Sequence, residues 1–144
     1  MLNYTKVITG EKSYSGLQMK EINPVMKLII RGKKREFLSA IGKSLNLLLP
    51  TEANTSSISE KLTALWLSPD EWMIYSNETI NSENNEYETE NLLNKNISKI
   101  NLGAVTDVTD QFVLINIKGD KIFDLFETGS PFNFNDFRYK NGSV

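Results

Sequence analysis

Residues 62–75 read LTALWLSPDEWMIY, two apolar runs separated by a short polar turn. Leu62–Leu67 and Trp72–Tyr75 carry the aliphatic and aromatic residues that favour strands. Between them stands Ser68-Pro69-Asp70-Glu71, in which proline fixes φ at the second position of a tight turn and Ser or Asp favours the flanking positions. This stretch therefore predicts an antiparallel β-hairpin.

The segments on both sides of this hairpin alternate between strand and helix patterns. A short apolar run with β-branched members predicts a strand over Val25–Ile30. Apolar residues at helical spacing predict helices from about Lys33 to Ser44 and from about Tyr87 to Lys99, and a strand follows at Ala104–Thr109. The order strand, helix, strand, strand, helix, strand is that of a split βαβ, or ferredoxin-like, α+β fold.

The remaining segments are shorter or less regular. Asn54–Ser59 is polar and small and predicts a loop. Beyond the last strand, the pattern predicts another strand over Phe112–Lys118 and a helix from Asp120 to Thr128 that stops at Gly129. The stretch after that helix is irregular and rich in aromatic residues.

The chain also contains an internal repeat, because Gly32 and Gly119 lie 87 residues apart and other positions match at the same offset. The alternative is a chance likeness of two β-turn-α units, and three glycines in register favour a true repeat. The matched pairs are Gly16 with Gly103, Gly32 with Gly119, Gly42 with Gly129, Leu28 with Ile115, Ile30 with Ile117, and residues 45–47 with residues 132–134.

The repeat predicts a first β-α-β-β-α unit over residues 1–102 and an incomplete second unit, β-β-α, over residues 103–144. The second copy reaches Val144, which corresponds to Ser57, so it lacks the hairpin, second helix and last strand of the first copy. A partly built unit leaves sheet edges and apolar faces uncovered. We therefore expect the second copy to pack on the first copy, on a partner chain or on a further C-terminal part.

Composition limits the function. The chain has no cysteine and no histidine, which excludes disulfides, thiolate nucleophiles and the commonest metal ligand and general base. A net charge of −2 gives no electrostatic reason for a nucleic-acid partner. No apolar run approaches the length of a membrane span and no signal peptide is visible, so we expect a cytoplasmic protein without membrane contact.

Aromatic residues provide the candidate interface. Trp66 and Trp72 flank the hairpin turn, where they either stack across the hairpin in the core or anchor a partner. A second aromatic group crowds the C-terminal quarter, beside the incomplete repeat, and favours an interface over ordinary core. The candidate interface residues there are Phe132, Phe134, Phe137 and Tyr139, with Phe123 and Phe126 nearby.

Charged residues provide further candidates, each with a plain structural alternative. Asp70 and Glu71 could form an acid/base pair, although the residue preferences of a tight turn explain them without a catalytic role. Asp107 and Asp110 could bind a metal or a pterin, or they could simply end a strand. A basic cluster at the start of the first helix could bind an anion or remain solvated, and it consists of Arg31, Lys33, Lys34 and Arg35.

Three ordered segments resemble the sarcosine oxidase gamma subunit family. Residues 66–72, Trp-Leu-Ser-Pro-Asp-Glu-Trp, resemble its Trp-Leu-Gly-Pro-Asp-Glu-Trp hairpin, and Asp107-Val108-Thr109-Asp110 resembles its Asp-Val-Ser-Asp step into a strand. Gly119 and then residues 129–134, Gly-Ser-Pro-Phe-Asn-Phe, resemble its unit ending Gly-Cys-Pro-Leu-Asp-Leu. The likeness covers roughly Lys61 to Arg138. Ser130 replaces the usual cysteine, and the family normally continues through a second hairpin and helix.

The resemblance implies a role inside a larger enzyme. In that family, alpha, beta, gamma and delta subunits together oxidise the N-methyl group of sarcosine, pass the one-carbon unit to tetrahydrofolate and reduce oxygen to hydrogen peroxide. The complex uses FAD, FMN, NAD and tetrahydrofolate, and the gamma subunit is not known to carry the flavins or the substrate site. Its fold is akin to the folate-binding domain of the glycine cleavage aminomethyltransferase.

The resemblance therefore implies a non-catalytic subunit that binds no cofactor itself, and it carries over no catalytic or metal-ligating residue. Its partners would be the alpha, beta and delta subunits. The alternatives are a stand-alone folate-binding protein of one-carbon metabolism, with the basic cluster or Asp107 as contacts, and an α+β domain with an unrelated interaction role.

Overall fold

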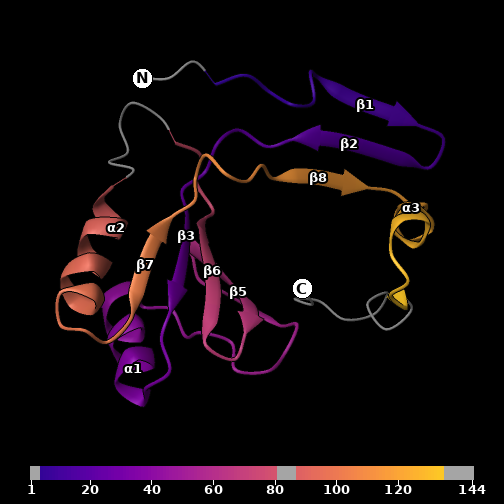
Figure 1. Cartoon of the computed structure of the whole chain (residues 1–144). Helices are drawn as coiled ribbons and strands as arrows, with labels where there is room; N and C mark the ends of the chain where they lie inside the picture. The colour runs from indigo at the N-terminus through magenta and orange to yellow at the C-terminus, as the bar shows by residue number, and fades with distance from the viewer. Residues whose placement is uncertain (1–3, 81–86, 135–144) are drawn as a thin grey trace. The chain divides into compact units, whose positions relative to one another are not determined.

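The computed structural model describes residues 4–80 and 87–134. The chain forms two compact units, one built mainly from the middle of the sequence and one from segments near both ends (Figure 1). The described residues of the central unit are 24–80 and 87–112, and those of the terminal unit are 4–23 and 113–134.

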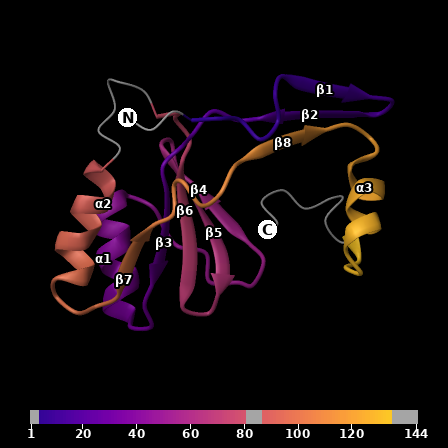
Figure 2. The same cartoon turned by 45° about the horizontal axis from the view of Figure 1, so that its top comes forward.

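The central unit is a five-stranded antiparallel sheet in the order β4-β5-β6-β3-β7, with helices on one face (Figure 2). Its chain order β3-α1-β5-β6-α2-β7, together with the strand order β5-β6-β3-β7, is the ferredoxin-like arrangement, so the predicted α+β fold class is confirmed. The elements are β3 (Lys27–Arg31), α1 (Arg35–Leu45), β4 (Ser56–Ile58), β5 (Leu62–Ser68), β6 (Glu71–Ser76), α2 (Glu88–Leu93), the π-helical turn η1 (Asn94–Ser98) and β7 (Ala104–Asp107).

The core of the central unit lies between the sheet and its helices. Alternate residues of β3, Leu28 and Ile30, point to the helical face, as the two-residue period of a strand requires. From α1, Phe37 lies against them and stacks on Trp72 of β6, with ring centroids 5.9 Å apart. The cluster of buried side chains consists of Met26, Leu28, Ile30, Phe37, Ile41, Leu47, Leu62, Ala64, Trp72, Ile74, Leu93 and Ile97.

The predicted hairpin is confirmed, since β5 and β6 pair directly across their turn. The loop predicted over Asn54–Ser59 is wrong in part, because Ser56–Ile58 forms the edge strand β4 against β5. This strand carries almost no apolar signal of its own. Pairing with the strongly specified β5 supplies its backbone hydrogen bonds, which is a tertiary effect that the local sequence does not record.

The terminal unit is a three-stranded antiparallel sheet in the order β1-β2-β8, followed by one helix. Among its described residues, no hydrophobic side chain is fully buried. The sheet and helix therefore have apolar surface without a closed core of their own. The elements are β1 (Glu11–Tyr14), β2 (Leu17–Glu21), β8 (Ile115–Lys118) and α3 (Ile122–Gly129).

The secondary structure follows the 87-residue repeat. Strands β2 and β7 begin 87 residues apart, β3 and β8 end 87 residues apart, and α1 and α3 begin 87 residues apart. In each sheet the first strand of one copy pairs with the second strand of the other, because β2 pairs with β8 and β7 pairs with β3. The repeat predicts that the sequence divides between residues 102 and 103. The two compact units of the structure have other boundaries, because each unit contains parts of both copies.

Two of the repeated glycines, Gly103 and Gly119, lie where two strand ends meet. A Cβ atom on Gly103 would overlap the carbonyl oxygen of Arg31, and one on Gly119 would overlap the carbonyl oxygen of Gly16. Gly119 also has φ +132°, which side chains other than hydrogen rarely allow. The glycines are thus required by close backbone approach. None of the helices formed by the described residues has the length and apolar character needed to cross a membrane.

Candidate interaction surface

The hairpin tryptophans have different environments. Trp72 is 3% exposed, packs against Phe37, and donates its indole N–H to the carbonyl of Pro50 at 2.7 Å. A buried indole with a satisfied N–H is typical of a core residue. Trp66, its partner across the hairpin, is half-buried and packs against the edge of the core. Trp72 is therefore a core residue, whereas part of the Trp66 side chain remains at the protein surface.

The hairpin turn is tied to the end of β3 by charge. The Asp70 carboxylate accepts a hydrogen bond from Ser68 Oγ at 3.0 Å and lies 3.5 Å from Arg31 Nε and 3.7 Å from Lys33 Nζ. The Ser68 hydrogen bond, followed by the two cations, lowers the pKa of Asp70. The Asp70 carbonyl also accepts the Gly32 N–H at 3.0 Å. These contacts agree with a structural role in the turn.

We expect Asp70→Asn to lower the urea midpoint at neutral pH. The folded-state pKa of Asp70 lies below its ordinary value of about 4, so its contribution to stability is present above that pH and is lost as pH falls through the folded pKa. The difference between wild type and variant should therefore shrink toward acid pH. Glu60→Gln, at an exposed position, is the control for loss of one negative charge. A difference that stays constant from neutral to strongly acid pH would contradict the ion-pair account.

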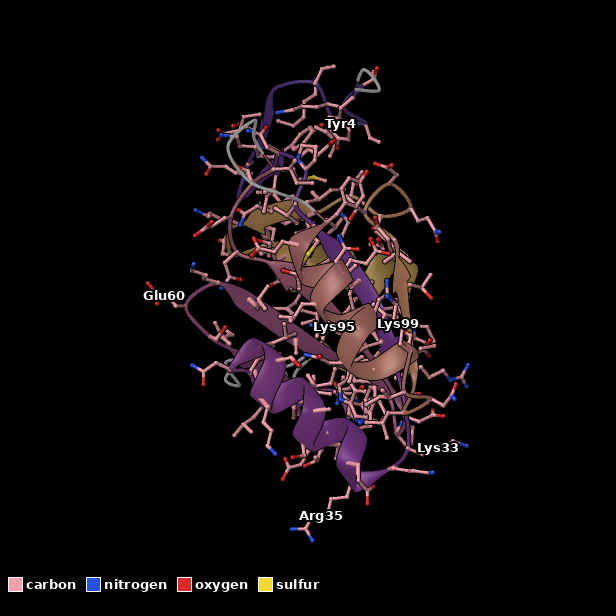
Figure 3. The ribbon with its side chains drawn as sticks, turned by 90° about the vertical axis from the view of Figure 1, so that its left-hand side faces the viewer. Tyr4, Lys33, Arg35, Glu60, Lys95 and Lys99 are labelled. Carbon is pink, nitrogen blue, oxygen red and sulfur yellow. The ribbon has the colours of Figure 1, made fainter. Side chains whose placement is uncertain are left out.

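The predicted basic cluster does not converge on one point. Arg31 and Lys33 face Asp70, whereas Lys34 only begins α1 and makes no capping hydrogen bond with its side chain. Figure 3 shows Lys33 and Arg35 directed to different sides of the start of α1. Arg35 borders an open hollow of about 410 Å³ on the outer face of α1, together with Glu36, Ser39, Ala40 and Lys43. Arg31 and Lys33 therefore share one environment, beside Asp70, and Arg35 lies in another.

The two strand-end aspartates lie near a residue that the sequence reasoning missed. Asp107 accepts the backbone N–H of Thr109 at 2.8 Å, and Thr109 Oγ1 accepts the backbone N–H of Lys27 at 3.0 Å. Lys27 is 2% exposed, and its ammonium donates to the carbonyl of Val25 at 2.9 Å. Burial lowers the pKa of Lys27, and the charges of Asp110 and Asp107 oppose this. The signal in the sequence for this buried residue is a lysine within an otherwise apolar strand.

The terminal unit carries a group of neighbouring aromatic rings, named here the aromatic surface and defined as Phe123, Phe126, Phe132 and Phe134. Phe126 and Phe132 are exposed, and Phe123 and Phe134 are half-buried. The ring of Phe134 lies 5.3 Å from Phe132, 5.5 Å from Phe126 and 6.5 Å from Phe123, measured between centroids. Phe126 is 39% exposed and Phe132 is 46% exposed. The structure thus brings two predicted interface residues, Phe132 and Phe134, onto one surface.

The other two predicted interface residues, Phe137 and Tyr139, lie outside the described residues. Large apolar side chains grouped on a protein surface are typical of binding sites for other proteins. The aromatic surface is therefore the strongest interaction candidate that the described residues present.

Comparison with known proteins shows a relationship of fold. No protein-family model matches the chain, and no curated protein matches it. A chain of heterotetrameric sarcosine oxidase from Corynebacterium sp. U-96, solved in complex with pyrrole 2-carboxylate, has a similar structure, with a TM-score of 0.70 and 15% sequence identity. The match covers 86% of this chain and 60% of that chain, so this chain spans less than two thirds of its structural neighbour.

Proposed function

We propose that this chain is a gamma-type, non-catalytic subunit of a heterotetrameric sarcosine oxidase, where it supports assembly of the flavoenzyme. The observation that carries the proposal is the fold shared with a chain of such an enzyme over 86% of this sequence. The hairpin, strand-step and glycine-helix segments that resemble the gamma family point to the same complex independently of the fold.

The packing of the terminal unit supports a role as a subunit. Its described residues bury no hydrophobic side chain fully, although its helix and the following segment carry four neighbouring phenylalanines. Burial of apolar surface is the main stabilising term of a folded unit, at roughly 25 cal/mol for each Å² removed from water. A partner that covers this surface would therefore supply stabilisation that the described residues of the unit do not provide.

The proposal assigns the chemistry to other chains. The alpha, beta and delta subunits are the proposed partners, and FAD, FMN, NAD and tetrahydrofolate are proposed to bind to them and not to this chain. The complex would demethylate sarcosine oxidatively to glycine and transfer the one-carbon unit to tetrahydrofolate in the cytoplasm. The side chains of this chain would act through packing and orientation of the assembly.

Removing two rings of the aromatic surface should weaken assembly. Truncating well-packed interface aromatics typically costs 2 kcal/mol or more, so we expect Phe126→Ala with Phe132→Ala to weaken association with the other three subunits by at least about tenfold. The measurement is the amount of this chain retained on a tagged alpha subunit as its concentration is lowered.

Leu48→Ala is the matched control, because Leu48 is 81% exposed and lies in the central unit, away from the aromatic surface in sequence. Circular dichroism should show that both variants remain folded. Unchanged retention of the folded double variant would contradict a role of the aromatic surface in assembly.

A further inference from the structure

The outer side of α1 carries positive charge. Phe37 and Ile41 of this helix turn into the core. At about 3.6 residues per turn, Arg35, Ser39 and Lys43 therefore lie on the side that faces away from the sheet. Arg35 and Lys43 are both exposed, and they lie about 12 Å apart along the helix axis.

The turn after α2 carries two further cations. Ile97 is buried against the core, whereas Lys95 and Lys99 are exposed. In Figure 3, which faces the two helices, Lys95 and Lys99 lie at η1 and Arg35 lies at the start of α1. The N–H of Lys99 donates to the carbonyl of Asn94 at 2.9 Å, which is the hydrogen bond of a π-helical turn. Such turns occur frequently at functional sites.

The two elements lie side by side in the central unit. The side-chain amide of Asn96 in η1 donates to Ser44 Oγ in α1 at 2.8 Å. The exposed cations of both elements therefore belong to one surface on the outer side of the helices. This surface, named here the basic face, consists of Arg35, Lys43, Lys95 and Lys99.

The charge of the basic face is not balanced by its surroundings. The helical layer, residues 31–49 and 87–103, contains seven lysines or arginines and three glutamates, so it carries a net charge of +4. The whole chain carries −2, and the remaining residues therefore carry −6. Within the described part of the chain, none of the four cations of the basic face forms an ion pair or a side-chain hydrogen bond. An acidic chain thus gathers positive charge on one pair of helices.

The open hollow of about 410 Å³ on the outer side of α1 lies within this face. Arg35 and Lys43 line it together with the small residues Ser39 and Ala40. Glu36 is the one carboxylate among its lining residues. Free space beside small residues, with cations two helical turns apart, suits the acidic side chains of a partner.

Exposed apolar side chains accompany the two lysines of the basic face. Leu92 is 39% exposed and Ile100 is 59% exposed. Leu92 precedes Lys95 by about one helical turn, and Ile100 directly follows Lys99. Interfaces between proteins combine apolar contacts with a polar and charged rim. The basic face therefore offers both kinds of contact to another protein.

We propose that the basic face is a docking surface for an acidic segment of a partner protein, with carboxylates opposite its four cations and apolar residues opposite Leu92 and Ile100. Complementary charge speeds the encounter of two proteins and fixes their orientation. The surface lies in the central unit and goes beyond the proposed function, since it does not depend on which complex contains the chain.

Nucleic acid and a second copy of this chain fit the basic face less well. Glu36, Glu88 and Glu90 interrupt the positive charge of the helical layer, whereas a phosphate backbone carries negative charge at every nucleotide. In a second copy, the acidic helix α3 already pairs Asp124 with Lys121 at 3.1 Å. A partner protein can place its carboxylates between the three glutamates.

The probe is a fluorescently labelled peptide with glutamate and leucine at helical spacing, of about 15 residues so that it can form a helix. Titration of the full chain into the peptide at low salt, followed by anisotropy, should show saturable binding. A peptide with glutamine at every glutamate position should not bind. Added salt should weaken the binding, because it screens exposed charges beyond about 10 Å at 0.1 M.

Two double variants locate the binding. Lys95→Glu with Lys99→Glu should weaken binding of the acidic peptide by at least about tenfold. Lys12→Glu with Lys61→Glu is the matched control, because both lysines are exposed, lie outside the helical layer and give the same change in net charge. A peptide with lysine in place of glutamate should bind the first variant more tightly than it binds the wild-type chain. Circular dichroism checks that both variants fold.

The outcomes separate this inference from the proposed function. Absence of peptide binding, or equal weakening by the two double variants, overturns the docking surface even if the chain assembles with the flavoenzyme subunits. Labelled single-stranded DNA that binds the basic face more tightly than the peptide would make nucleic acid the occupant and would overturn it too. The same holds for wild-type dimers that dissociate in the Lys95→Glu, Lys99→Glu variant without any peptide binding. Binding that follows the variants and the charge exchange supports the surface, even where assembly with sarcosine oxidase subunits fails.

Discussion

Replacing Phe37 by alanine is expected to lower the free energy of unfolding of the central unit by about 3–5 kcal/mol. Phe37 is completely buried, stacks on Trp72, and lies where Gly32 and Gly103 leave space for its ring. Its removal would leave a cavity between α1 and the sheet, and the glycine backbones around it have no side chains that could move in to fill it. Urea unfolding followed by tryptophan fluorescence measures the effect, because both tryptophans, Trp66 and Trp72, lie in this unit.

Leu48→Ala is the matched control for this variant. Leu48 is 81% exposed, and a surface substitution of this kind typically changes stability by less than about 0.5 kcal/mol. A loss below about 1 kcal/mol for Phe37→Ala would mean that Phe37 is not the centre of the packing between α1 and the sheet.

The second large effect is expected for Gly103→Ala, which should destabilise the central unit by about 1–3 kcal/mol. A Cβ atom at this position would overlap the Arg31 carbonyl oxygen and would also press on the Phe37 ring. Relief would require β7 to move away from the end of β3, where Ala104 lies opposite Arg31. The same fluorescence-detected urea unfolding measures the loss.

Gly42→Ala provides the comparison within the same unit, because a Cβ atom there would make only ordinary contacts, 3.8 Å from the Leu48 side chain and 3.9 Å from the Leu47 carbonyl oxygen. Gly42 lies in α1, where alanine also has the higher helix propensity. Equal behaviour of the two glycine variants would contradict the close backbone approach that the structure shows at Gly103.

The fold of the central unit could be predicted because its signals are local and strong. The Ser68-Pro69-Asp70-Glu71 turn separates two clear apolar runs, and the spacing of Phe37 and Ile41 is helical. The structure places β5, β6 and α1 close to the predicted bounds. In these segments secondary-structure propensity, hydrophobic periodicity and turn residues all indicate the same elements, and such agreement makes a structure predictable from its sequence.

Strands β1 and β2 were not predicted, because their sequences are mostly polar and their burial is low. Glu11–Tyr14 is exposed throughout, and only Leu17 and Met19 in β2 give a weak alternation. Gly16, in a positive-φ turn between them, contributes to the sequence prediction only as a member of the repeat. Pairing of β2 with the distant β8 is a long-range effect that no local pattern contains.

The candidate site was predictable in part. The aromatic composition after Gly129 favours an interface, which stays a prediction, and the structure places the rings of Phe132 and Phe134 side by side. Trp72 could not be assigned from sequence, because the same residue type anchors cores and interfaces, and only burial separates the two. Lys27 was missed since a single lysine in a short apolar run is ordinarily taken as a residue at the surface.

One buried carboxylate, that of Glu21, links the N-terminal segment to the terminal sheet. Glu21 accepts hydrogen bonds from the Tyr4 hydroxyl and from the backbone N–H of Ile8, the latter at 2.8 Å. The hydrogen bond with Tyr4 lowers the pKa of Glu21, and the same contact raises the pKa of Tyr4 to about 12. These contacts hold the segment before β1 against the end of β2, in a unit whose described residues form no closed apolar core.

Co-expression with the alpha, beta and delta subunits of a heterotetrameric sarcosine oxidase tests the claim that this chain acts as a structural subunit, which we propose above. Size exclusion with simultaneous flavin absorbance should show this chain in the coloured complex. Its omission should impair assembly or sarcosine oxidase activity. If the chain elutes alone, folded and colourless, while the other three subunits form an active complex without it, the claim is wrong.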